Sequence, residues 1–556
     1  MGWLGEKSAA YLALKEDDET TTSNSSLARV SVEYPSREYP PAGMNGAGAA
    51  GERDESAKAS TSLPSSSRRT GFWDRVSILQ SYAVQVYCPS LFVFGCNGMV
   101  IPVIPPMARE VFQASDTMNG LVMSSLNLAG VVVDIPGAFL IARLGADLSG
   151  VFSGSMLFLS GILGATARNV YVLTLSRFVH GLGQVTWLTS RTYIFSLASA
   201  KAGENHRGFL ISGLGGMQRI SSVIMPILGS YVAARFGFRA IFLLVSTFGA
   251  LVVPFALMAY ARQAKSSANR APLELELKLR RSPLKTSSNA LSALDHEEAE
   301  ALVPNATQGR GPKTQSSSLI QTMAASVRVV REIMRMNWRE LLTVGSPCLV
   351  LNMLRQARDF LFALAAMNAG FNQGEIGLLV SSMYTMDFLS FPLSGILMDR
   401  FGRKYALTSS LLCLSLGCVL LSVTSGYKAL IFLVAFVAGS GSGIGAGIAM
   451  CMGADLSNVA LLKHKRRRLR DEGGSCEGPL SDKFVMTVFL GIFRATQDLG
   501  QFFGPSLVGT LSQVVSLRFS GLLCGGAGVL AAGFTVLCVE ETRDLARKLL
   551  DQGGSR

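Results

Sequence analysis

Apolar residues along this chain gather into about twelve runs separated by short polar stretches. Each run is roughly 20 residues long, the length that an α-helix needs to cross a hydrocarbon core of about 30 Å. Lipid offers the backbone no hydrogen-bond partners, so such runs are expected to be helices. We therefore predict an all-α membrane protein with transmembrane helices near residues 80–106, 118–141, 149–167, 171–197, 207–234, 238–260, 341–368, 374–398, 405–424, 427–454, 484–512 and 517–539.

Longer polar segments separate the predicted helices into two six-helix halves. The N-terminal segment is rich in Ser, Thr, Gly and Glu and offers too little apolar surface to fold, so it predicts a disordered tail. The first part of the segment between the halves has a similar composition, and we expect it to be disordered too. The expected order is a cytosolic tail at 1–75, a first half at 76–260, a linker at 261–339, a second half at 340–542 with a basic insertion at 456–483, and a C-terminal tail at 543–556.

The last part of the linker differs, because apolar residues recur there at helical spacing beside arginines. This pattern predicts a basic amphipathic helix near 317–339. Such a helix lies either on the inner leaflet of the membrane or against the inner face of the protein, and the sequence leaves both open. The apolar positions are Ile320, Met323, Val327, Val330, Met334 and Trp338, and the basic ones are Arg328, Arg331, Arg335 and Arg339.

The formal net charge of +13 suggests nucleic acid at first, but its distribution argues for a membrane instead. Basic residues cluster in connections that the helix count places on one side of the membrane, namely Lys201, Arg207, 400–404 and 463–470. The positive-inside rule assigns this side to the cytosol, together with both termini and the linker. We expect these clusters to contact anionic lipids of the inner leaflet and not nucleic acid.

Composition argues against several other classes of protein. Only 16% of the residues are charged, against about 25% in typical soluble proteins. The nine cysteines show no paired spacing, so neither a disulfide framework nor a metal site is expected. No catalytic constellation or phosphate-binding loop stands at a usable spacing. We therefore expect neither an enzyme nor a cofactor.

The two halves read as repeats of each other. Residues Ser124 to Gly145 align without gaps onto Ser381 to Gly402. In the second half this segment ends in a basic loop whose glycines are expected to let two helix ends approach closely. We expect Asp399 to pair with the loop arginines or to cap the next helix. The predicted gating residues are Gly395, Asp399, Arg400, Gly402, Arg403 and Lys404, with Arg143 and Gly145 in the first half.

The pattern Gly-x-x-x-Asp-Arg-x-Gly-Arg-Lys, placed between the second and third helices of a half, resembles the loop signature of the major facilitator superfamily of secondary transporters. The resemblance covers roughly 75–260 and 340–545 and implies two six-helix halves that rock about a central cavity. In the first-half copy Ala142 and Ala146 stand where the second half has Asp399 and Arg403. The inner gate is therefore expected to depend more on the second-half loop.

Two further motifs resemble proton-coupled branches of this superfamily. The stretch from Arg177 to Gly183 resembles the motif R-x-x-Q-G-x-G, with His180 in place of the glutamine. The region around Pro226 and Gly229 resembles the drug:proton antiporter branch, although Met225 stands where that branch has a glycine. The resemblance implies a small-molecule substrate, protons as the coupling ion and a monomeric protein.

Ionisable residues inside the predicted helices are the candidates for a proton or substrate pathway, because each costs a few kcal/mol to insert. Arg355 with Asp359 and Arg494 with Asp498 have i,i+4 spacing, which predicts pairs on one helix. The candidates are Asp134, Arg177, His180, Arg219, Arg358, Asp359, Asp387, Arg494 and Asp498.

Asp134 and Asp387 have no basic residue within one turn of their own helices. Each is expected either to carry a proton or to pair with an arginine of a neighbouring helix, and Arg219 is the candidate partner of Asp387. If Asp387 carries the proton, Asp387→Asn is expected to abolish pH-driven transport while the protein stays folded.

The sequence thus predicts a secondary active transporter that moves a small solute by alternating access, with proton-coupled antiport favoured. A facilitator or proton symporter of the same fold remains an alternative. A non-transporting membrane receptor or scaffold is an alternative from another class.

Overall fold

The computed structural model describes residues 83–202, 207–281, 330–424, 426–471, 482–542 and 545. The predicted tail at 1–75, the linker from 282 to 329 and nearly all of the predicted C-terminal tail lie outside the described residues. Throughout the described ranges the regular structure is helical and no strand occurs. The predicted all-α fold class is confirmed.

Each predicted apolar run of the first half is helical. The first run is divided, because Pro102 and the Pro105-Pro106 pair remove backbone donors. The helices are the π-helix η1 (Ala83–Tyr87), α3 (Cys88–Val100), α4 (Ile104–Glu110), α5 (Asp116–Leu144), α6 (Ala146–Ala165), α7 (Val170–Ala202), α8 (Arg207–Phe236) and α9 (Phe238–Arg281).

The second half repeats this order. Its fourth membrane-spanning run is divided at Gly447, which has a positive φ of 78° between two helices. The helices are α11 (Trp338–Thr343), α12 (Gly345–Asn368), α13 (Gln373–Arg400), α14 (Arg403–Val423), α15 (Lys428–Ile444), α16 (Ile448–Asp471), α17 (Asp482–Val514) and α18 (Leu517–Cys538).

Seven helical segments in the described part of the chain are long and apolar enough to cross a membrane by length and composition alone. The other five long helices, α5, α7, α8, α12 and α17, each carry ionisable residues in their interior. These residues lower the hydropathy of a helix, and they must face protein or water instead of lipid. The protein is a multi-pass membrane protein, and its least apolar helices are those that meet inside it.

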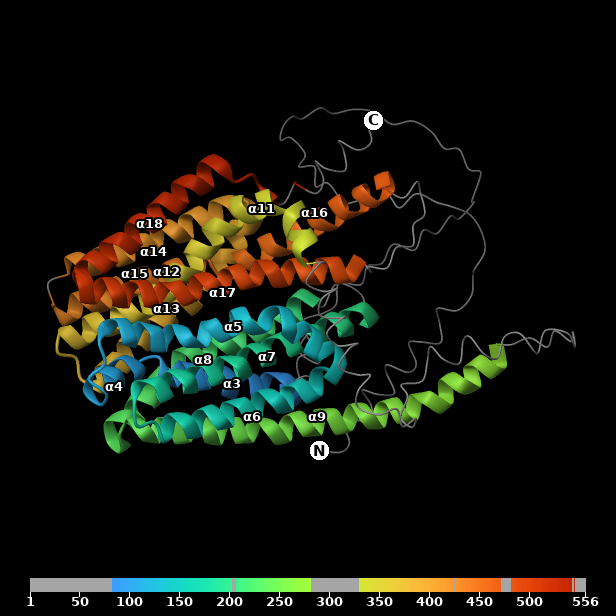
Figure 1. Cartoon of the computed structure of the whole chain (residues 1–556), viewed down its shortest axis with the longest axis horizontal. Helices are drawn as coiled ribbons and strands as arrows, with labels where there is room; N and C mark the ends of the chain where they lie inside the picture. Colours follow the sequence, from blue (N-terminus) through green and yellow to red (C-terminus); the bar gives the residue numbers. More distant parts are fainter. Residues whose placement is uncertain are drawn as a thin grey trace, which may run out of the picture. The chain divides into compact units, whose positions relative to one another are not determined.

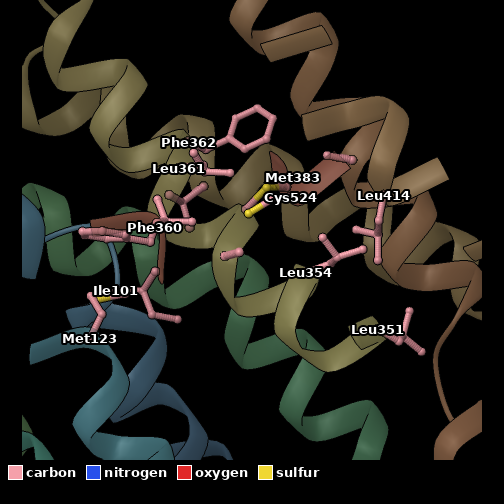
Figure 2. Packing of buried hydrophobic residues seen from close by; sticks show 14 of the residues in the cluster. Ile101, Met123, Leu351, Leu354, Phe360, Leu361, Phe362, Met383, Leu414 and Cys524 are labelled. Atoms are coloured by element: carbon pink, nitrogen blue, oxygen red, sulfur yellow. The ribbon is translucent and has the colours of Figure 1, made fainter. Parts of the chain in front are cut away.

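Two pairs of helices join the halves. Helix α5 packs along α17, and α8 packs along α13 (Figure 1). Within the halves, α6 packs on α9 and α14 packs on α18. One apolar core runs through both halves, with Ile101 and Met123 from the first half and Phe360 and Leu361 of α12 from the second (Figure 2).

Small residues permit the closest approach between the halves. A Cβ atom at Gly120 of α5 would overlap the carbonyl oxygen of Pro505 in α17, and one at Gly377 of α13 would overlap Ser230 of α8. Gly120 and Gly377 occupy equivalent positions when the gapless repeat alignment is extended four residues toward the N-terminus. The predicted repeat therefore includes the glycine positions at which the helices of the two halves pack most closely.

The basic loops follow the sequence prediction in part. Gly145 and Gly402 both precede a helix and have positive φ angles of 77° and 93°, which glycine adopts at little cost. Gly395 faces open space, so the close approach expected there is not found. The first amides of α14, from Arg403 and Lys404, donate instead to the carboxylate of Glu541, at 2.9 and 3.2 Å.

Two helices extend beyond their predicted ends. Helix α9 continues to Arg281 and includes Pro272, although the sequence predicted that a disordered linker begins at residue 261. Helix α16 includes the basic stretch 463–470, which was predicted to be a loop. Its charges are partly compensated, since Lys463 pairs with Glu340 and Arg467 lies 3.5 Å from Glu332.

The predicted amphipathic helix is described only from residue 330 onward. Residues 330–336 are helical, and α11 follows after a bend. Ile333 is buried, whereas Met334 and Trp338, which belong to the predicted apolar stripe, are 46% and 53% exposed. Of the predicted apolar stripe, Val330 packs against the core beside Ile333, whereas Met334 and Trp338 face outward.

We expect Gly161→Val in α6 to destabilise the protein by about 1–3 kcal/mol, because the new side chain would overlap the backbone of α9 at Phe242 and Ser246. The thermal unfolding midpoint of the full-length protein in detergent measures the effect. Gly526→Val in α18 is the matched control, since no atom lies within 4 Å of its Cβ position. Equal losses in the two variants would contradict this packing.

Candidate functional site

The candidate site lies where α5 meets α17 and α8 meets α13. We call the end of the bundle with the turns at 111–115 and 369–372 the far end. The opposite end, where α9 leaves the first half and α11 enters the second, is the linker end. The ionisable candidates lie between these ends, in the middle of their helices.

Polar contacts close the far end between the halves. Arg109 donates to the side-chain oxygen of Asn368 at 2.9 Å, and Ser512 donates to the carboxylate of Asp116 at 2.9 Å. Further along α5, the hydroxyls of Ser124 and Ser506 are 2.8 Å apart. The interface is therefore bonded from the far end toward the middle of the helices.

Arg219 of α8 forms an ion pair with Asp387 of α13, which joins the two halves. Ser442 of α15 donates to the second carboxylate oxygen of Asp387 at 2.9 Å. The guanidinium of Arg219 also lies over the ring of Phe391, 4.5 Å from its centre. Of the two alternatives for Asp387, the structure shows the pairing with Arg219. Each oxygen of this carboxylate has a partner, Arg219 for one and Ser442 for the other.

A second charged cluster is built on α12 within the second half. Asp359 pairs with its neighbour Arg358 at 2.9 Å and accepts from the Tyr384 hydroxyl at 2.7 Å. The predicted i,i+4 pair of Arg355 and Asp359 is therefore wrong. Arg355 donates to the backbone carbonyl of Ser442 instead, at 2.8 Å, because α12 presents it to α15.

The third cluster lies between α5 and α17. Arg494 lies 3.3 Å from the carboxylate of Asp134, across the halves, so the predicted pairing of Arg494 with Asp498 on one helix is also wrong. Asp498 points at Gly130 of α5 and accepts from Gln501 at 3.0 Å. The Asp134 side chain is 1% exposed, and its two oxygens make no hydrogen bond to the described residues.

Arg177 and His180 lie together on α7. Arg177 is 2% exposed and donates to the side-chain oxygen of Asn97 in α3 at 3.0 Å. His180 is equally buried, and neither its Nε2 nor the Nε and Nη1 atoms of Arg177 have a hydrogen-bond partner among the described residues. The structure therefore holds a buried positive charge here with one neutral partner.

The gating loop is tied within the second half. The guanidinium of Arg403 lies 3.3 Å from Asp455 of α16, and Asp455 also accepts from Thr542 at 3.0 Å. Asp399 and Arg400 are exposed, whereas the side chain of Arg143 lies outside the described part. The anchors Asp455 and Glu541 were not predicted, because neither belongs to a spacing pattern that marks it in the sequence.

No group of three or more His, Cys, Asp or Glu side chains that could hold a metal ion occurs in the described ranges. The site thus consists of guanidinium, carboxylate, hydroxyl and imidazole groups. Such groups can bind protons and polar solutes, and can bond two helices reversibly.

Comparison with known proteins follows this geometry. Residues 87–345 match the model of the Major Facilitator Superfamily. A search of curated proteins finds no match. Among solved structures, a D-xylose–proton symporter superimposes with a TM-score of 0.54 at 17% identity, covering 83% of this chain and 98% of that one. The chain has the fold of the Major Facilitator Superfamily.

Two further structures of this fold resemble the chain. The nucleoside transporter NupG has a TM-score of 0.52 at 13% identity, covering 81% of this chain and 97% of that one. The xylose transporter XylE from E. coli, in a partially occluded inward-open conformation, has a TM-score of 0.53 at 17% identity, covering 83% and 99%. At such identities the likeness concerns the fold alone.

We expect Arg219→Met to destabilise the protein by on the order of 3 kcal/mol, because it leaves the largely buried carboxylate of Asp387 without its opposite charge. The double variant Arg219→Met/Asp387→Asn should recover much of this loss, since it removes both charges. Thermal unfolding of the three proteins measures the difference. If the double variant is as unstable as the single one, the ion pair is not what holds these two helices together.

Proposed function

We propose that this protein is a secondary active transporter that moves a small polar solute by alternating access. The observation that carries the proposal is the pair of interfaces between repeat halves, each closed by a partly exposed arginine that pairs with a buried aspartate. If these contacts served stability alone, apolar side chains would stabilise the interface at least as well, because buried ion pairs contribute little net stability. Charged contacts between two movable halves suit an interface that must open and re-form.

The direction of opening follows from the contacts. The far end is bonded by side chains from both halves, so a solute would enter the site from the linker end in this conformation. Gly215 and Gly216 of α8, toward the linker end, have no atoms within 4 Å of their Cβ positions. If the linker end is cytosolic, as the distribution of basic loops predicts, this is an inward-facing state.

The proposed coupling ion is the proton. Buried carboxylates at the interface are Asp134, Asp387 and Asp498, and each contacts the opposite half. A proton taken up or lost by such a group changes the attraction between the halves, which links proton movement to rocking. Efflux in exchange for protons is the favoured direction, on the resemblance of the region around Pro226 and Gly229 to antiporters.

We expect a thermal-shift panel of drugs, organic acids, sugars and amino acids to identify a ligand of the full-length protein. A ligand at about a hundred times its Kd stabilises a protein by roughly 2.7 kcal/mol. The ligand should then cross proteoliposome membranes, and an imposed proton gradient should drive its accumulation on the side that antiport predicts.

Two controls separate this proposal from its alternatives. An uncoupler should abolish the accumulation, whereas a facilitator would equilibrate the solute regardless of the gradient. Ligand binding without any flux would contradict transport and favour a receptor.

A further inference from the structure

The interface between α5 and α17 holds one more carboxylate than arginine. The carboxylate of Asp498 lies against Gly130, one turn before Asp134 on α5. Arg494, one turn before Asp498 on α17, lies 3.3 Å from Asp134, so two carboxylates and one guanidinium interact across this interface. Both carboxylates are less than a tenth exposed. Two ionised carboxylates have no hydrogen to share, so a direct contact between them is favourable only when one of them carries a proton.

Comparison with the second interface shows that this carboxylate is an addition. The repeat also aligns Gln218-Arg219 and Pro226 of α8 with Gln497-Asp498 and Pro505 of α17, so Asp498 corresponds to Arg219. In the alignment of α5 with α13, Gly130 corresponds to Asp387. At the α8–α13 interface these positions hold an ion pair, whereas at the α5–α17 interface they hold a carboxylate facing a glycine. The Arg494–Asp134 contact then stands one turn nearer the linker end. Each interface therefore contains one arginine–aspartate pair, and the α5–α17 interface has an additional carboxylate, that of Asp498.

We propose that Asp134 and Asp498 form the proton-binding site of this protein and hold one proton between them beside Arg494. The inference rests on the proposed transport function and specifies where the coupling ion binds. Asp134 supplies the unsatisfied oxygens that the proton would bridge, since neither accepts a hydrogen bond from the described residues. The adjacent guanidinium makes the site unsuitable for a metal cation, which a fixed positive charge would repel.

Other charged groups on the helices packed against α5 and α17 are engaged elsewhere or stand apart. On α7, Arg177 donates to Asn97, with His180 beside it. On α12, Arg355 donates to a backbone carbonyl and Arg358 pairs with Asp359. On α4 and α18 the described charges lie at helix ends, at Arg109, Glu110 and Arg518. On α16, Asp455 lies 3.3 Å from Arg403 and Lys463 pairs with Glu340, whereas His464, Lys465, Arg466 and Arg467 lie in the C-terminal part of the helix. Among the described residues, Arg494 is the charged group that interacts with the two carboxylates, and the neutral amide of Gln501 donates to Asp498 at 3.0 Å.

The shared proton connects the two halves, because Asp134 belongs to the first and Asp498 to the second. When the proton leaves, two like charges face each other across the interface and push α5 away from α17. Separation of the helices would in turn let water reach each carboxylate. Proton release and opening of this interface are thus one event, while the one-to-one pair of Arg219 and Asp387 has no need of a proton.

Infrared spectra of the full-length protein in lipid vesicles, recorded across a pH series, test the site without any substrate. We expect the wild type to show a carbonyl band of a protonated carboxyl group that disappears as pH rises. Asp134→Asn and Asp498→Asn should each lose this band, and Asp387→Asn, the matched control, should keep it. Persistence of the band in both interface variants, or its absence from the wild type, would overturn the proposal.

Thermal unfolding shows whether the variants are folded, and Asp498→Asn is sufficient alone if Asp134→Asn fails to fold. With a solute from the panel, Asp498→Asn should lose gradient-driven accumulation but keep exchange of labelled for unlabelled solute. Accumulation that remains driven by the proton gradient in this variant contradicts the site. If the wild type shows the titrating band but no flux, the transport function fails and the proton site stands.

Discussion

The structure depends on how ionisable side chains are kept inside a membrane protein. Each such group is costly in lipid, so the helices that carry them must face one another. Helices α5, α8, α13 and α17 do so in two pairs, and each pair joins one half of the protein to the other. This constraint places the charged helices in the interior of the protein. It also places arginine and aspartate at the boundary between the halves, where forming or breaking their ion pairs can close or open the interface.

Small residues and charges cooperate at this boundary. Gly120 and Gly377 let the helix backbones approach, and the hydroxyl contact of Ser124 with Ser506 lies between Gly120 and the charged cluster of α5. The two interfaces have the same plan because the halves are repeats. They differ in where their charges stand, because Asp498 and Gly130 occupy the positions of Arg219 and Asp387, and the Arg494–Asp134 contact lies one turn away. An almost symmetrical scaffold thus contains one asymmetric charge.

The fold could be predicted from the sequence, because apolar length and the repeat of the basic loop are local signals. Each predicted apolar run is helical, but two runs are divided, around Pro102 and at Gly447, and α9 and α16 continue into polar sequence. Pairing was harder to predict. The i,i+4 spacing of Arg494 and Asp498 predicted an ion pair within one helix. In the structure the side chain of Arg494 is directed toward α5 and pairs with Asp134 instead. Such choices depend on how neighbouring helices are turned, as do the anchoring roles of Asp455 and Glu541.

The central claim is that the far-end interface must open for a solute to cross. Asp116→Cys/Ser512→Cys places two thiols where side-chain oxygens now lie 2.9 Å apart, between α5 and α17. Oxidation of this variant in proteoliposomes should stop solute flux, and a reductant should restore it. The single substitutions Asp116→Cys and Ser512→Cys, treated identically, should stay active. Undiminished flux through fully cross-linked protein would contradict alternating access at this interface.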